Sequence, residues 1–338
     1  MHPRDHATPA DDQYEDLLGL WSDLESALSV VLARPLQVQE FAAKVQQVDR
    51  WLQDLVAHDI DAALYLMFQL ATTSTVGYSA SHALVCGTLC HILALELRLP
   101  QPERDSLVRA ALTMNIAMTA LQDVLAEQRE RPSAAQQDAI RNHPHESQAL
   151  LTRLFIKDAL WLDVVGQHHA ALPERVPLAQ QPAKDRLTRI LGTIDRYAAM
   201  ISPRKSRAGR SATDSVRAIV GQENALRDEV SYTLVRAVGL CPPGTFVRLD
   251  NGDIAVVLRR SDKANHPLVA SIIDARGEHR HEPRLHQTAV SKPRVQSALA
   301  RSAVTVELNH RTMVRLGLYA AQHSQELRSM VTVPGALH

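Results

Sequence analysis

Five side chains of this sequence could together hold metal ions, although they lie far apart along the chain. They are His82, His143, the adjacent pair His168 and His169, and Asp195. Imidazole nitrogens and a carboxylate that converge from several helices inside a bundle are ligands that suit transition metals. The chain has 16 histidines, so one histidine alone would be weak grounds for such a site. The order in which these five residues occur is more informative.

The five residues lie in four of five short motifs whose order resembles that of the HD-GYP family. The motifs are Tyr78-Ser-x-x-His82, Ala110-Ala-Leu, His143-Pro, His168-His169 and Asp195-x-Tyr197. The resemblance implies an all-helical HD-type domain and a metal-dependent hydrolase of cyclic di-GMP. It also implies one metal position formed by His143, His168 and His169, and a second formed by His82 and Asp195.

The two motifs that give the family its name are absent from this chain. Where the family has its His-Asp pair followed by Gly and Lys, the chain reads Met114-Asn115-Ile-Ala-Met118. After His168-His169 it continues Ala-Ala-Leu-Pro, without the family's Glu and Gly-Tyr-Pro. An amide cannot bridge two cations as a carboxylate does, and a thioether is a poor ligand for hard or borderline metals. We therefore predict a degenerate active site that retains at most about one divalent ion, either iron, manganese or zinc.

A basic segment follows the aspartate and reads Ser202-Pro-Arg-Lys-Ser-Arg-Ala-Gly-Arg210. In the family, basic residues just beyond this aspartate help to hold the phosphates of the substrate. The resemblance therefore implies phosphate binding by Arg204, Lys205 and Arg207. Guanidinium groups suit this role because their N–H donors match the geometry of phosphate oxygens. The alternative for a short charge cluster of this kind is a solvated loop.

The overall composition argues against several classes of function. The 37 basic and 37 acidic side chains cancel, so no overall field recruits nucleic acid or an anionic membrane. The apolar stretch at 83–97 looks too short to span a bilayer, and the N-terminus lacks a signal-peptide pattern. Three cysteines form no disulfide framework, and Cys86 and Cys90 are expected to pack as small apolar residues. We expect a cytoplasmic protein.

Apolar residues recur at helical spacing along most of the chain, which predicts a mainly α protein. We expect an N-terminal helical region in residues 1–76 and an HD-type bundle in residues 77–238. Residues 239–338 are expected to form a small β element followed by a C-terminal helix over 312–330. The β element is expected because Asn251-Gly252 between apolar runs predicts a hairpin. Ser133 is expected to cap a helix that ends before His143-Pro144, since proline disfavours helix at the residue before it.

Three functions remain open at the level of sequence. The first is a non-catalytic signalling module that acts through protein contacts, and the second is a receptor that binds cyclic di-GMP without cutting it. The third is a metal-dependent phosphodiesterase that works with a reduced metal centre. Met114 and Asn115 favour the loss of enzymatic activity. The apolar faces of three N-terminal helices predict dimerisation, or docking of a protein partner, through residues 13–70.

Overall fold

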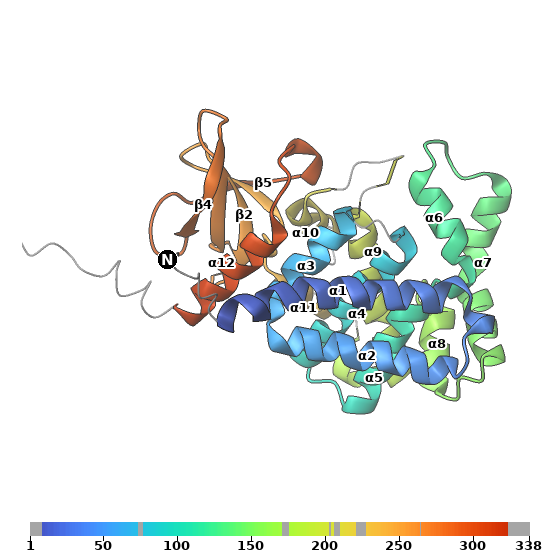
Figure 1. Ribbon diagram of the computed structural model, residues 1–338. Helices are drawn as coiled ribbons and strands as arrows, with labels where there is room; N and C mark the ends of the chain where they lie inside the picture. The colour runs from blue at the N-terminus through green and yellow to red at the C-terminus, as the bar shows by residue number, and fades with distance from the viewer. Residues whose placement is uncertain are drawn as a thin grey trace, which may run out of the picture.

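Helices make up most of the chain, and a small antiparallel sheet lies near its C-terminal end (Figure 1). The computed structural model describes residues 9–73, 77–170, 176–202, 204–205, 210–220, 228–263 and 265–323. The fold class predicted from the sequence is confirmed. The helices are α1 (Pro9–Ala33), α2 (Phe41–His58), α3 (Ile60–Thr73), α4 (Tyr78–Glu96), α5 (Gln101–Thr113), α6 (Thr119–Glu127), α7 (Ala134–Arg153), α8 (Ala159–Gln167), α9 (Ala183–Ile201), α10 (Ala212–Val220), α11 (Glu229–Val238) and α12 (His310–Gln322). Short 3-10 turns lie at Pro35–Gln37, Ile116–Met118, Leu178–Gln180 and Arg301–Ala303.

Helix α4 is the central element of the helical part. It contacts α1, α2, α3, α5, α6, α9 and α11, and its residues from Ser79 to Ala94 are all buried. Among the described residues, this helix is long and apolar enough to cross a membrane by length and composition, whereas the apolar stretch at 83–97 looked too short in the sequence. However, 89% of its apolar window is buried inside the protein, where the neighbouring helices cover it.

The apolar faces of the N-terminal helices are covered by the chain itself. Trp21, Leu24 and Leu28 of α1 are fully buried, and so are most of the apolar residues of α2. Helix α1 packs on α2, α4 and α12, which leaves few apolar side chains such as Val30 and Leu36 exposed. The residues that suggested a partner surface in 13–70 therefore form core, because one chain supplies enough helices to cover their stripes. Dimerisation stays a prediction without that support.

Helix α7 differs from the sequence-based expectation because it runs unbroken through Pro144. Its start agrees with the expectation, since Ser133 and Gln136 form a reciprocal capping box. Proline inside a helix removes one backbone N–H donor and leaves the carbonyl four residues earlier without its usual partner. Here that carbonyl belongs to Ile140, and the ring of His143 binds it. This replacement bond lets the helix continue, so the predicted break at 142–145 is wrong.

The sheet has the strand order β4-β3-β2-β1-β5 and lies at one end of the helical part (Figure 1). Strands β1 (Phe246–Leu249) and β2 (Ile254–Arg259) form the predicted hairpin, in which Gly252 takes a φ of 93°. Strand β3 (Leu268–Ile273) was also expected. Strands β4 (His279–Gln287) and β5 (Val295–Leu299) were missed, because β4 is mostly polar and neither edge strand contains a buried residue. Helix α12 (His310–Gln322) corresponds to the first part of the helix predicted over 312–330. Residues from 324 onward lie outside the described ranges.

Partly buried ion pairs attach the sheet to the helical part. Asp61, in the first turn of α3, accepts from Arg260 Nε at 2.6 Å and lies 3.2 Å from Arg259 Nη2. Arg259 also pairs with Asp59 at 2.8 Å. Because both arginines come from the end of β2, these contacts fix the sheet beside α3 and leave the predicted metal ligands on the helices.

Candidate metal-binding site

Three of the predicted ligands meet where α7 passes the C-terminal end of α8. His143 lies in α7, and His168 and His169 follow the last residue of α8. One ligand atom from each lies within 4.8 Å of those of the other two. The Nε2 atoms of His143 and His168 are 3.1 Å apart, and the rings of His168 and His169 have centroids 4.2 Å apart. We call these three residues the histidine triad.

Backbone carbonyls orient two imidazoles of the histidine triad. The Nδ1 atom of His143 lies 2.6 Å from the Ile140 carbonyl oxygen that Pro144 leaves available. The Nδ1 atom of His168 lies 2.8 Å from the carbonyl oxygen of Val165. A carbonyl oxygen only accepts, so each Nδ1 must carry the proton. In the neutral ring the lone pair is then on Nε2, which is the arrangement that a metal-binding histidine needs.

Burial keeps these imidazoles neutral. Desolvation lowers the pKa of His143, and it lowers the pKa of His168 to about 3, with a further contribution from nearby His169. Two neutral rings whose Nε2 lone pairs face one another at 3.1 Å repel each other unless a cation lies between them. Two metal–nitrogen bonds of about 2.0–2.1 Å would place such nitrogens about 3.3 Å apart at the tetrahedral angle. The residues present therefore fit one divalent metal ion.

The remaining predicted ligands form a second group between α4 and α9. His82 Nε2 lies 2.9 Å from Asp195 Oδ1, and Cys86 Sγ lies 3.6 Å from the same nitrogen. Burial alone would raise the pKa of Asp195, but the bond to His82 and the nearby His168 and His169 hold it well below its usual value. Since His168 and His169 contribute to this lowering of the Asp195 pKa, the second group lies beside the histidine triad.

Cys86 is a candidate ligand that the sequence-based reasoning missed. It packs in the core as expected, but its sulfur also takes part in the second ligand group. The signal was available, because residues four apart on a helix lie on the same face and Cys86 follows His82 by four. Cys90 lies one turn further along α4 and is equally buried, but it belongs to neither ligand group among the described residues.

The predicted phosphate-binding residues separate in the structure. Arg204 donates from Nε and Nη2 to the hydroxyl of Tyr78 at 3.2 and 2.9 Å, and its guanidinium lies over the Tyr78 ring. The Tyr78 ring in turn stacks on His82 with centroids 5.6 Å apart. Arg204 is therefore held beside the metal ligands. Lys205 instead pairs with the exposed Glu127 of α6, and Arg207 lies outside the described residues.

Met114, Asn115 and Met118, where the chain departs from the family motif, lie in the segment between α5 and α6. Met114 is buried at the end of α5, and Asn115 is half-buried directly after it, followed by the turn that ends at Met118. The backbone N–H of Ala117 donates to Ser147 Oγ of α7 at 3.2 Å. On the other side, Trp161 Nε1 of α8 donates to Thr113 Oγ1 at 2.8 Å. The segment 113–117 is thus bound to both helices that carry the triad.

A glycine on α9 makes the close approach of Asp195 and the triad possible. A Cβ atom at Gly192 would lie 2.6 Å from the backbone oxygen of His168. We expect Gly192→Ala to push α9 away from the end of α8, to destabilise the fold by about 1–3 kcal/mol and to weaken metal binding. Urea unfolding and a Mn²⁺ titration measure the two effects.

Gly19→Ala is the matched control for this substitution. Gly19 is an exposed glycine within α1 whose Cβ would meet nothing within 4 Å. Alanine should therefore stabilise this position by up to about 1 kcal/mol through its higher helix propensity. If Gly192→Ala were as well tolerated as Gly19→Ala, the contact between α9 and His168 would not restrict the site.

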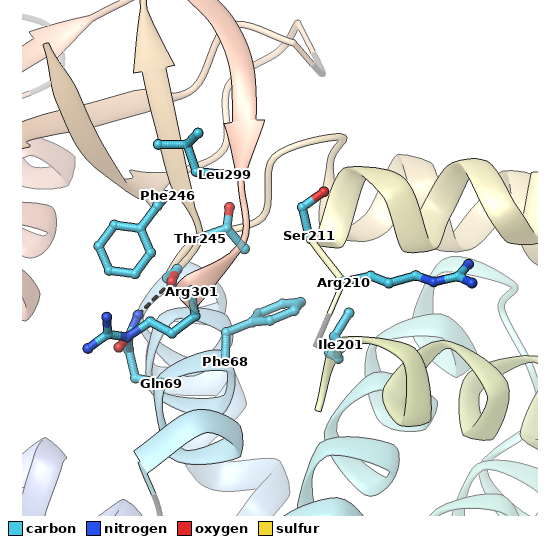
Figure 2. Close-up of a pocket in the computed structure, with 10 residues that line it drawn as sticks. Phe68, Gln69, Ile201, Arg210, Ser211, Thr245, Phe246, Leu299 and Arg301 are labelled. Carbon is cyan, nitrogen blue, oxygen red and sulfur yellow. Dashed lines mark hydrogen bonds between the residues drawn. The ribbon is translucent and has the colours of Figure 1, made fainter. Parts of the chain in front are cut away.

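A separate hollow lies between the helical part and the sheet (Figure 2). Its lining comes from α3, the end of α9 and the sheet, and includes Phe68, Ile201, Arg210, Phe246 and Arg301. At its edge Gln69 Nε2 donates to the carbonyl oxygen of Gly244 at 2.5 Å. None of the predicted metal ligands, and neither Arg204 nor Lys205, lines this hollow, so it is distinct from the site around the histidine triad.

Comparison with known proteins agrees with the motif order. Over 209 residues the chain is 27% identical to a Pseudomonas aeruginosa protein named cyclic di-GMP phosphodiesterase PA4108. The match covers 60% of this chain and 49% of that protein, so the chain spans about half the length of the curated relative. This similarity to a cyclic di-GMP phosphodiesterase supports the resemblance to the HD-GYP family that the motifs indicated.

No protein-family model matches the chain. Among solved structures, Bd1817, described as an HDG"Y"P protein from Bdellovibrio bacteriovorus, aligns with a TM-score of 0.49 and 13% sequence identity. That alignment covers 69% of this chain and 75% of Bd1817.

Proposed function

We propose that this protein is an HD-GYP-related receptor that binds cyclic di-GMP at the site of the histidine triad and hydrolyses it poorly or not at all. One observation carries the proposal. Met114 and Asn115 stand where the family has its His-Asp pair, beside a ligand site whose other members still converge. The family's bridging carboxylate is replaced, while the other candidate ligands still lie together. Binding therefore has more support than catalysis.

A metal ion held by His143, His168 and His169 would supply Lewis acidity and would neutralise phosphate charge when bound. The protein's own residues contribute orientation. Pro144 and the Ile140 carbonyl fix the His143 ring, and Asp195 holds His82 in place. Without a second carboxylate to bring two metal ions together, the site lacks the clamp that stabilises both the attacking and the leaving oxygen. This favours retention of the dinucleotide over its cleavage.

Arg204 supports an anionic ligand. Its guanidinium has five N–H donors, and two of them bind the Tyr78 hydroxyl. The stack of Arg204 on Tyr78 and of Tyr78 on His82 presets the orientation of the cation at little entropic cost. A phosphate bound between the metal and Arg204 would thus meet positive charge on two sides.

Equilibrium binding of fluorescently labelled cyclic di-GMP, with and without Mn²⁺, tests the proposal. We expect saturable binding that strengthens with metal, and we expect Arg204→Ala to weaken it by at least about 10-fold. Lys205→Ala is the matched control, because Lys205 points to Glu127 and its loss should change affinity by less than about 3-fold. An absence of binding by the unmodified protein, or equal losses in both variants, would contradict the proposal.

A second candidate function is residual metal-dependent hydrolysis of cyclic di-GMP with a reduced centre. The observation that favours it is the histidine triad, in which His143 and His168 are neutral and whose three imidazoles suit one metal ion and one activated water. The binding experiment and a turnover assay on the same preparation separate the two candidates.

A further inference from the structure

The second ligand group contains a thiol that the family resemblance does not assign. Cys86 is completely buried on α4, one turn after His82, and its Sγ is 3.6 Å from His82 Nε2. The ligand atoms of His82, Cys86 and Asp195 all lie within 4.8 Å of one another. They come from two helices that pack directly on each other, α4 and α9, so the group has a rigid frame.

The separation of sulfur and nitrogen matches that of two ligands on one tetrahedral metal ion. A metal–sulfur bond of about 2.3 Å and a metal–nitrogen bond of about 2.0–2.1 Å at the tetrahedral angle place the two atoms about 3.5 Å apart. Cys86 Sγ and His82 Nε2 are 3.6 Å apart. The oxygen of Asp195, now 2.9 Å from the same nitrogen, would need to move away by only about half an ångström.

Burial and the nearby Asp195 carboxylate raise the pKa of the Cys86 thiol, so a bound cation is what would release its proton. Asn115 has removed the negative charge that would have been shared between two metal ions. A coordinated thiol loses its proton, so Cys86 together with Asp195 would supply two negative charges to one divalent ion. His82 can bind through Nε2 while Nδ1 carries the proton, and Nδ1 makes no hydrogen bond to any residue the structure describes.

We propose that His82, Cys86 and Asp195 form a three-ligand site for a thiophilic divalent ion such as Zn²⁺, next to the histidine triad. The thiolate discriminates against Mn²⁺ and Mg²⁺, because soft sulfur ligands favour zinc and cobalt over hard cations. Three protein ligands leave a fourth position for water or for a phosphate oxygen of a bound ligand. The proposal rests on the metal-binding part of the proposed function but does not require cyclic di-GMP.

Cobalt substitution tests the thiolate directly. The full-length protein is stripped of metal under reducing conditions and titrated with Co²⁺ alone. We expect the near-ultraviolet sulfur-to-cobalt charge-transfer band to appear in the unmodified protein and in Cys90→Ser, and to be absent from Cys86→Ser. Cys90 is the matched control because it is just as buried on the same helix but belongs to neither ligand group among the described residues. A missing band in the unmodified protein, or a band that survives in Cys86→Ser, overturns the proposal.

Metal selectivity provides a second readout. We expect Cys86→Ser to lower Zn²⁺ affinity by at least about 10-fold and Mn²⁺ affinity by less than about 3-fold. Cys86→Ala serves the same purpose if serine in the buried position prevents folding, and circular dichroism verifies the fold of each variant. Equal losses for both metals would overturn the proposal. Because no arm contains cyclic di-GMP, a failure here leaves the receptor function to its own binding test.

Discussion

Purified protein supplied with Mn²⁺ or Fe²⁺ is expected to convert cyclic di-GMP to linear pGpG at least about 10³-fold more slowly than an HD-GYP enzyme with a complete site. The physical reason is the exchange of a bridging carboxylate for the uncharged amide of Asn115, next to the thioether of Met114. Neither side chain can hold two cations together. Chromatographic measurement of pGpG over time gives the rate.

Asn115→Asp is the informative variant for this prediction. It returns the carboxylate to the segment that is bound to α7 through Ser147 and to α8 through Thr113. We expect it to raise the turnover rate above that of the parent by about 10-fold or more, even though Met114 and Met118 remain. Sustained multiple turnover by the parent protein that disappears with a chelator would show that the amide does not limit the chemistry.

Loss of either buried histidine of the triad is expected to abolish retention of Mn²⁺. The parent should keep at most about one Mn²⁺ per chain after gel filtration, because the other ligand group contains a thiol that suits softer metals. His143→Ala or His168→Ala removes one of three ligands from a buried site and should lower affinity by more than about 100-fold. Elemental analysis of the gel-filtered protein measures the ratio.

Two further variants make this test specific. His145→Ala is the matched control, because His145 lies on α7 two residues after His143 but is exposed. It should retain Mn²⁺ like the parent. Pro144→Ala should weaken binding by about 10- to 100-fold, since the new N–H competes with the His143 ring for the Ile140 carbonyl. Retention of Mn²⁺ by His168→Ala, or two Mn²⁺ ions per chain in the parent, would contradict this account of the triad.

The sequence predicted those parts of the fold that have a strong local signal. Apolar periodicity gave the helices, and Asn251-Gly252 gave the hairpin because its backbone needs positive φ. The edge strand β4 was not predicted, although it forms a hairpin with β3, because its mostly polar residues lack the apolar alternation of a strand. The break at Pro144 was predicted wrongly because the compensating bond comes from a side chain, His143, whose direction only the folded helix defines.

The candidate site could be predicted only in part, because the sequence shows which residues could act but not where their side chains lie. The motif order brought His82, His143 and Asp195 to attention, but it could not show that Arg204 stacks on Tyr78 while Lys205 points away. Likewise, Cys86 looked like a core residue, because a cysteine that packs in the core and a cysteine that binds a metal cannot be told apart from the sequence alone. Only the approach of α9 to α4 places a carboxylate beside that thiol.

The most direct test of the central claim is recovery of the bound dinucleotide. Protein in molar excess over radiolabelled cyclic di-GMP is incubated with Mn²⁺ for many times the turnover period of an active HD-GYP enzyme, and the complex is isolated by gel filtration. Denaturation then releases the bound label for chromatography. The receptor function predicts that the label co-elutes with protein and is intact cyclic di-GMP. Recovery of the label as pGpG, or its failure to co-elute with the protein, would contradict it.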